Sequence, residues 1–152
     1  MLYDCATEID SDTVVFHDAL TTSLGIPGAA FWEVTEADKV RIFEHKVEPV
    51  GEWLIEYADA IVATGGIATH YNLPYGDIYM EVDEPCRRRG FGSYLIQELK
   101  KVGYEMGRIP AARCNVANAA SRATLQKAGL LPCARILSGV FPEKLEKDPT
   151  LD

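Results

Sequence analysis

Long hydrophobic runs are absent from the sequence. No window approaches the about 18 consecutive apolar residues that a membrane-spanning helix needs. Residues 1–12 are acidic, whereas a secretory signal starts with basic residues and continues with apolar ones. These absences predict a cytoplasmic protein with no membrane partner.

Cysteine is scarce and widely spaced. The four residues, Cys5, Cys86, Cys114 and Cys133, form no C-x-x-C pair. A zinc ribbon or a disulfide framework would need closer, paired spacing. We therefore expect reduced thiols, packed mostly in the core, and no metal site.

The length and composition are typical of one globular domain. The chain has 152 residues, of which 47% are apolar and 25% charged, and this excludes a disordered chain, a collagen helix and a coiled-coil rod. A chain of this size buries enough surface to fold without a metal or a disulfide. We expect a single domain over residues 1–152, with a charged tail at 142–152.

The charges are distributed unevenly along the chain. Residues 1–84 contain 17 acidic and three basic side chains, a net charge of −14, whereas residues 85–152 contain 12 basic and six acidic ones, a net charge of +6. An acidic half repels the phosphates of DNA and RNA, so no nucleic-acid partner is expected. The two halves suit ligands of opposite charge.

Hydrophobic periodicity predicts an α+β fold. The predicted helices are Ser11–Leu24, Thr35–Val47, a long helix that ends near Met106, and a helix from Asn118 or Ser121 to Ala128. The predicted strands are Trp53–Tyr57, Ala60–Tyr71 with a bulge at Gly65 and Gly66, Asp77–Asp83, Ala111–Val116, and one or two within Cys133–Phe141. We therefore expect an α+β (α/β-type) mixed central sheet flanked by about four helices.

The segment between the third strand and the long helix is rich in arginine and glycine. It reads Arg87-Arg88-Arg89-Gly90-Phe91-Gly92. Glycines let backbone N–H groups approach a ligand, and a helix N-terminus carries about half a positive charge. The segment therefore predicts a pyrophosphate site, with a tight turn and solvated arginines as the alternative.

Two common phosphate motifs do not fit this segment. The dinucleotide fingerprint G-x-G-x-x-G needs a third small residue where Leu95 stands. A P-loop needs Gly-Lys-Ser or Gly-Lys-Thr, and neither sequence occurs.

The Arg-Gly segment instead resembles the R/Q-x-x-G-x-G/A signature of the GNAT N-acetyltransferases. A second stretch agrees, because Asn115–Ser121 followed by Gln126–Leu130 is similar to the next strand and helix of that family. The resemblance is strongest over residues 52–139. It implies a GNAT-like fold, acetyl-CoA as acyl donor, and a V-shaped opening between two parallel strands that receives it.

The resemblance also assigns cofactor-binding residues. Glu81 and Val82 would offer backbone hydrogen bonds to the pantetheine arm, and Asn118 and Ser121 would flank it from the other side. The residues that would hold the pyrophosphate are Arg87, Arg88, Arg89, Gly90, Phe91, Gly92 and Ser93.

The residues that move protons are less well defined. The family often has a Tyr where Leu125 stands, some relatives have a carboxylate where Arg113 stands, and an aromatic is common in the place of Cys86. The candidates for a catalytic base are Glu81 and His70, with Asp77 and Asp83 acting through water, and the candidates for an acid are Tyr79 and Tyr104.

We therefore expect an enzyme that transfers an acetyl group from acetyl-CoA to a primary amine by direct attack. The acidic N-terminal half favours a small cationic amine or a basic peptide as acceptor. A non-catalytic acyl-CoA-binding module is the alternative, and binding of a nucleic-acid or protein phosphate is a third. A strand edge at Cys133–Phe141 would also allow a homodimer.

Overall fold

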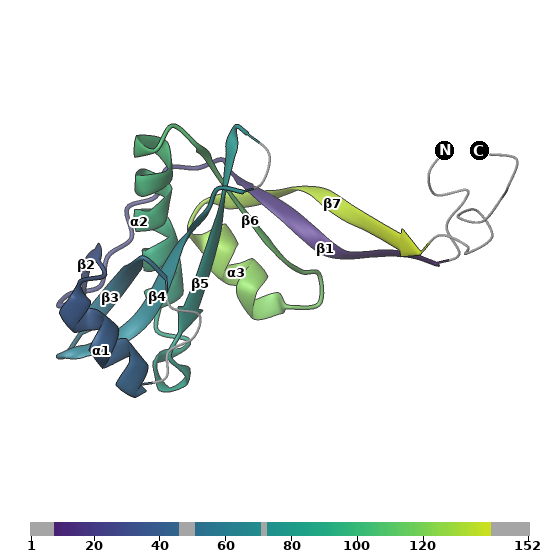
Figure 1. Ribbon diagram of the computed structural model, residues 1–152. Coiled ribbons are helices and arrows are strands. Elements are labelled where there is room, and N and C mark those ends of the chain that lie inside the picture. The colour runs from purple at the N-terminus through teal and green to yellow at the C-terminus, as the bar shows by residue number, and fades with distance from the viewer. Residues whose placement is uncertain (1–7, 46–50, 71–72, 141–152) are drawn as a thin grey trace, which may run out of the picture.

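The computed structural model describes residues 8–45, 51–70 and 73–140. A seven-stranded mixed sheet forms its centre, in the order β2-β3-β4-β5-β6-β1-β7 (Figure 1). The strands are β1 (Glu8–Asp18), β2 (Ala30–Glu33), β3 (Trp53–Tyr57), β4 (Ala60–Ala68), β5 (Tyr75–Val82), β6 (Ile109–Asn115) and β7 (Leu130–Val140). Neighbouring strands are antiparallel except β5 and β6, which are parallel.

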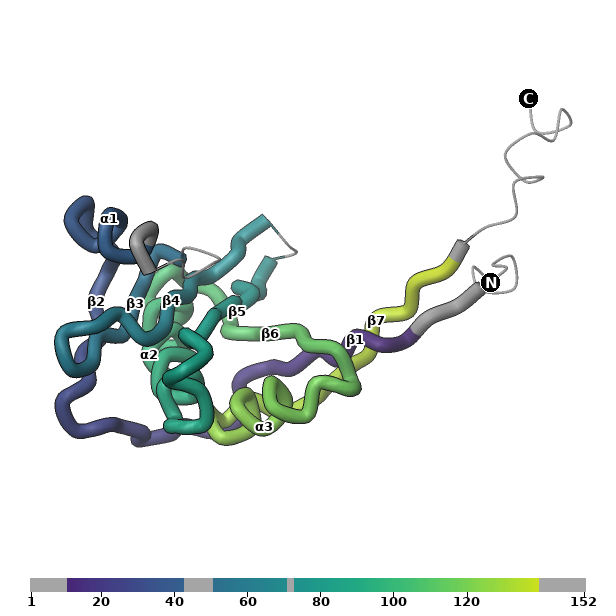
Figure 2. The backbone as a smooth tube through the Cα atoms, turned by 90° about the horizontal axis from the view of Figure 1, so that it is seen from below, coloured from purple at the N-terminus to yellow at the C-terminus, as the bar shows by residue number. Residues whose placement is uncertain are grey.

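Three α-helices cover the two faces of the sheet. They are α1 (Glu36–His45), α2 (Phe91–Glu105) and α3 (Ala119–Lys127). Figure 2 shows α1 on one face and α2 with α3 on the other. No helix in the described part of the chain is long and apolar enough to cross a membrane.

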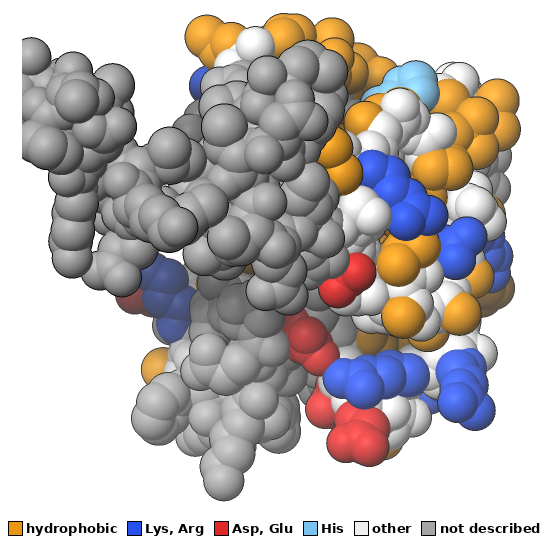
Figure 3. Space-filling view, turned by 90° about the vertical axis from the view of Figure 1, so that its right-hand side faces the viewer, with side chains coloured by type: hydrophobic (Ala, Val, Ile, Leu, Met, Phe, Trp, Pro, Cys, Tyr) orange, Lys and Arg blue, Asp and Glu red, His pale blue; other side chains and the backbone are white. Residues whose placement is uncertain are grey.

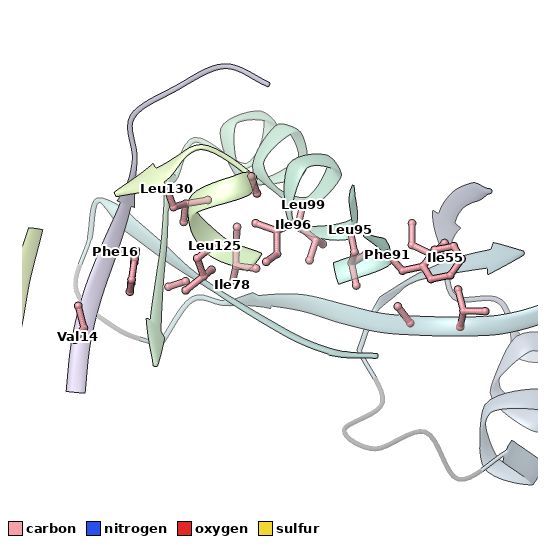
Figure 4. Close-up of a cluster of buried hydrophobic side chains, with 14 residues drawn as sticks. Val14, Phe16, Ile55, Ile78, Phe91, Leu95, Ile96, Leu99, Leu125 and Leu130 are labelled. Carbon is pink, nitrogen blue, oxygen red and sulfur yellow. The ribbon is translucent and has the colours of Figure 1, made fainter. Parts of the chain in front are cut away.

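The main core lies between α2 and the sheet. Phe91, Leu95 and Leu99 recur on one side of α2 and are fully buried (Figure 4). They pack with residues from distant strands, including Phe16 of β1 and Ile55 of β3. The long amphipathic helix predicted from the sequence is therefore confirmed. A smaller cluster of Ile42, Leu54 and Ile61 holds α1 on the opposite face.

The predicted helix Ser11–Leu24 is wrong, because β1 occupies most of that range. Val14 and Phe16 are buried on one side of the strand, and Val15 and His17 alternate with them. Pairing with β6 and β7 on both sides overrides the helical spacing of the apolar residues. The described residues therefore hold three α-helices where about four were expected.

Other local predictions are confirmed or corrected. The helix predicted from Thr35 is present, and the Asp38 N–H donates to Thr35 Oγ1 at 3.2 Å as a helix cap. The bulge predicted at Gly65 and Gly66 is wrong, because the β3–β4 register shifts between Ile55 and Glu56 instead. The unpredicted strand β2 lies within the Gly- and Pro-rich stretch after residue 25.

The C-terminal half agrees with its prediction. It holds β6, α3 and a single strand β7 at the edge of the sheet. The predicted charged tail lies outside the described residues. A homodimer through the β7 edge stays a prediction.

A buried lysine ties the chain after β1 to α2. The Lys100 ammonium donates to the carbonyls of Leu20 and Ala128 at 2.8 Å each and lies 2.7 Å from Asp18 Oδ1. Only 7% of the Lys100 side chain is exposed. Because the three partners come from the end of β1, the following segment and the end of α3, this contact holds β1 in place between β6 and β7.

Candidate active site

The parallel strands β5 and β6 separate partway along their length. They pair only from Tyr75 to Asp77 on β5, opposite Ile109 to Ala111 on β6. β5 continues along β4 as far as Val82. The sheet therefore has a V-shaped opening between β5 and β6, where the resemblance to the GNAT enzymes predicts one.

Backbone groups of β5 face this opening. The Asp83 N–H donates to the Val62 carbonyl at 2.9 Å, and residues that bond to an antiparallel neighbour alternate with residues that point away from it. The backbone of Glu81 is therefore directed to β4, whereas Met80 and Val82 point their N–H and C=O groups toward β6. Backbone contact of Glu81 or Val82 with pantetheine stays a prediction, and this orientation favours Val82.

A cavity of about 190 Å³ lies at the opening, on the face that carries α2 and α3. Its lining comes from both strands and both helices and comprises Ile78, Tyr79, Met80, Ile96, Ala112, Arg113, Ser121 and Leu125. Most of these side chains are apolar, which suits the uncharged pantetheine arm of an acyl-CoA.

The turn from β5 to α2 uses left-handed backbone. A 3-10 helix at Glu84–Cys86 is followed by Arg88 with φ +65° and Gly90 with φ +88°. Gly90 occupies the N-cap position of α2, and no side chain caps the helix. The N–H groups of its first turn are therefore available to an anion.

Two of the three arginines hold the turn together. Arg87 donates to the Glu81 carboxylate at 2.8 Å and to the Val82 carbonyl at 3.1 Å. The Arg89 guanidinium lies over the ring of Tyr57, 5.1 Å from its centre. Both side chains are therefore engaged within the protein.

Arg88 and Lys127 are the cations best placed for a phosphate. Both are exposed, and no described residue forms an ion pair with either of them. A Cβ atom at Gly90 would lie 3.4 Å from Lys127 Nζ, so this ammonium lies directly beside the turn. The sequence analysis missed Lys127, because nothing in the spacing shows that α3 ends beside Gly90.

The first residues of α2 are packed tightly. Phe91, Gly92 and Ser93 are buried, and a Cβ atom at Gly92 would lie 3.1 Å from Thr124 and 3.2 Å from Met80. Ser93 Oγ donates to the Thr124 carbonyl at 3.0 Å. The Phe91 and Ser93 side chains are therefore used in packing. Contact of these three residues with pyrophosphate stays a prediction, and it would use their backbone N–H groups.

The two predicted residues of α3 differ in their surroundings. Asn118 Oδ1 accepts a hydrogen bond from the Ser121 N–H at 3.0 Å and caps the helix. Ser121 lines the small cavity, and Asn118 does not. Contact of either residue with pantetheine stays a prediction.

A larger cavity, of about 620 Å³, lies on the opposite face of the sheet, over the paired ends of β5 and β6 and over β1 and β7, and it borders the opening at Arg113. Asp77 lines it, while its neighbour Ile78 points to the core under α2. The full lining is Val15, Phe16, His17, His70, Tyr75, Asp77, Ala111, Arg113, Cys133, Ala134 and Ile136. Arg113 lines this cavity and the small one, so the two cavities lie on either side of one residue.

An ion pair crosses the strands where the two cavities approach each other. Arg113 Nε lies 3.0 Å from Asp77 Oδ2. Burial raises the pKa of Asp77 above its ordinary value, although the charges of Arg113 and His70 act to lower it. Asp77 is therefore a carboxylate in a confined site with an increased tendency to take up a proton.

The two predicted catalytic bases lie apart. Glu81 is bonded to Arg87 and lines neither cavity. His70 is exposed and lines the larger cavity together with Asp77. His17 also lines this cavity, and the sequence analysis missed it because its strand had the spacing of a helix.

The hydroxyls of the two predicted acids have neighbours in the fold, although Tyr79 also lines the small cavity. The Tyr79 hydroxyl lies over Gly66 of β4, where a Cβ atom would be 2.6 Å from it. Tyr104 donates to Asp18 Oδ2 at 2.5 Å, and this bond together with burial raises the pKa of Tyr104 to about 12. Leu125, at the position where the resemblance led us to look for a Tyr, is buried.

Comparison with solved structures identifies the fold as that of the GNAT acetyltransferases. A GNAT-family acetyltransferase from Colwellia psychrerythraea superposes with a TM-score of 0.72 over 92% of this chain, at 14% sequence identity. A GCN5-related N-acetyltransferase from Sphaerobacter thermophilus gives a TM-score of 0.65 over 93% of the chain, at 18% identity. The chain spans 59% and 55% of the lengths of these two proteins.

The sequence itself matches the model of the acetyltransferase (GNAT) family over residues 17–130, which is more than half of the chain. The chain therefore belongs to the GNAT family. No curated protein matches it.

Proposed function

We propose that the protein is an N-acetyltransferase that transfers an acetyl group from acetyl-CoA to a primary amine in a ternary complex. The observation that carries the proposal is the position of Arg113, which lines a cavity on each side of the β5–β6 opening. A donor on the helix side and an acceptor on the other side would meet there without a covalent enzyme intermediate.

The residues of the turn fit the charged end of acetyl-CoA. Left-handed backbone at Arg88 and Gly90 and the uncapped start of α2 form a cradle of N–H groups. The Arg88 and Lys127 side chains add positive charge beside it. The pantetheine arm would follow the backbone groups of Met80 and Val82 into the small cavity.

The acceptor amine would approach from the larger cavity. Its nitrogen attacks the thioester carbonyl carbon, the carbon–sulfur bond breaks, and the electron pair leaves on the CoA sulfur. We place Asp77 as the base that takes the amine proton, because it lines this cavity and burial raises its pKa. His70, on the same cavity, and Glu81, which is bonded to Arg87, stay predictions for this role.

The hypothesis of a cationic acceptor gains no support from the lining of the cavity. Among the described residues of that lining, Asp77 is the one acidic side chain, and it is paired with Arg113. Among the other acids of the N-terminal half, Asp18, Asp38 and Glu56 have basic partners of their own. Figure 3 shows basic and hydrophobic side chains together on the right of one face, with acidic ones to the left and below.

A non-catalytic acyl-CoA-binding protein is the second candidate. It is favoured by the positions of the two candidate acids, since the Tyr79 hydroxyl lies against Gly66 and the Tyr104 hydroxyl is bonded to Asp18. Solvent could protonate the departing thiolate, so these positions would lower the rate without preventing the reaction.

The experiment is a calorimetric titration of the protein with acetyl-CoA, followed by a thiol-release assay with a panel of amines. The transferase predicts binding, and CoA release that depends on an amine. Binding with no release from any amine would favour the non-catalytic protein, and no binding would contradict the assignment of the turn.

A further inference from the structure

The wall of the larger cavity that lies farthest from β5 is built by β1 and β7. β1 lies almost wholly outside residues 17–130, which the family model matches, yet it is inserted between β6 and β7. His17 pairs with Ala111 of β6, and Ala111 pairs with Asp77 of β5. Paired residues share a face of the sheet, so His17 and Asp77 flank the small Ala111 across the cavity floor.

The next row of paired residues becomes apolar with distance from the opening. Arg113 of β6 pairs with Val15 of β1, and Val15 pairs with Ala134 of β7. Ile136 of β7 lines the cavity beyond them. The charged pair Asp77–Arg113 therefore lies on the β5–β6 side, and apart from His17 the described lining residues of β1 and β7 are apolar.

This arrangement defines what the cavity can hold. Its volume of about 620 Å³ is in the range of sites for small organic ligands. An amino group at Asp77 would leave the rest of the ligand against Val15, Ala134 and Ile136. A second ammonium placed there would lie against these apolar side chains, and no second carboxylate is among the described lining residues.

We propose that the acceptor is a primary amine on a compact apolar body, aliphatic or aromatic, rather than a polyamine or a basic peptide. This inference rests on the proposed function, since it places the reacting nitrogen at Asp77. The apolar body lies over β1 and β7, so a strand outside the matched family range selects the substrate.

The test compares phenethylamine, spermidine and trilysine as acceptors in the thiol-release assay with the full chain. We expect kcat/KM for phenethylamine to exceed that for either polycation by about tenfold or more, the discrimination that one to three kcal/mol of apolar contact gives. Equal values, or a preference for spermidine or trilysine, would overturn the inference.

A substitution in the lining of the larger cavity tests where the acceptor binds. Ala134→Phe fills the cavity from an exposed strand position and should raise KM for phenethylamine about tenfold or more while leaving the Kd for acetyl-CoA unchanged. Ala37→Phe, at an exposed position of α1 outside the cavity, is the matched control. An Ala134→Phe enzyme with the control's KM would contradict the placement.

Failure of the proposed function has a different signature. If acetyl-CoA binds and no amine releases CoA, the proposed transferase activity is rejected. Calorimetry can then still measure whether phenethylamine binds in the larger cavity. Binding that Ala134→Phe abolishes and Ala37→Phe keeps would support the ligand class, and its absence in the unmodified protein would reject it.

Discussion

Gly90 is the residue on which the proposed acetyl-CoA site depends most directly. Its φ of +88° costs an L-residue about 1–2 kcal/mol, and a side chain there would lie 3.4 Å from the Lys127 ammonium. We expect Gly90→Ala to weaken acetyl-CoA binding by about tenfold, because the turn must move to relieve the strain. Calorimetric titration measures the loss.

Gly107 provides the matched control for Gly90. It also has a positive φ, of +76°, but a Cβ atom there would contact nothing within 4 Å. Gly107→Ala should therefore be destabilised to a similar degree and bind acetyl-CoA normally. Equal loss of affinity in both variants would show that the turn has no special part in binding.

Asp77 carries the prediction for proton transfer. Asp77→Asn keeps the size of the side chain and removes the base, so we expect kcat to fall by about a hundredfold or more with little change in the Kd for acetyl-CoA. A base must be deprotonated to act, and burial raises the pKa of Asp77. In the unmodified enzyme the rate should therefore fall on the acid side at a higher pH than an exposed carboxylate would give.

The pH–rate profile separates a base from a structural residue. If Asp77 is the base, Asp77→Asn loses the acid limb of kcat/KM together with the rate. A variant that keeps the limb and most of the rate would place the base elsewhere, with His70 as the next candidate on the same cavity.

At the scale of the element, Lys100 decides how firmly β1 is held. Lys100→Met would remove a cation that three buried oxygen acceptors share, so we expect a loss of about 3–5 kcal/mol in the free energy of unfolding. Lys101→Met is the control on the same helix, since that side chain is 62% exposed and should change stability by less than about 0.5 kcal/mol. Urea denaturation measures both, and equal losses would contradict the anchoring role.

Elements with strong local signals could be predicted from the sequence. α2 has an apolar stripe that includes Phe91, Leu95 and Leu99, and α3 has Asn118 as its cap and Gly129 after its end. β1 could not, because Val14 and Val15 are adjacent and fit a helix face as well as a strand between two neighbours. Its identity is set by pairing with β6 and β7, which are about 100 residues away.

The candidate site, like the fold, could be predicted only where its residues are close together in the sequence. The turn was found from its glycines and arginines, which lie together in the sequence. Lys127, His17 and the cavity over β7 were not found, because folding alone brings them to the opening. The charge count alone does not define an acceptor site, because acids such as Asp18 and Asp38 are paired within the protein.

For the whole molecule, the order of the strands links the fold to the chemistry. The sheet splits between its one parallel pair, β5 and β6, and places a cavity on each side of Arg113. The insertion of β1 beside β6 would complete the proposed acceptor side with residues that precede the rest of the site in the chain. We infer that donor and acceptor enter from opposite faces and react in the opening.

The central claim is most directly tested by mass spectrometry of an amine panel after incubation with the protein and acetyl-CoA. The proposed function predicts an N-acetylated amine in equal amount to the free CoA released, and no product with Gly90→Val in place of the unmodified chain. Acetyl-CoA that binds to the protein while every amine keeps its mass would contradict it.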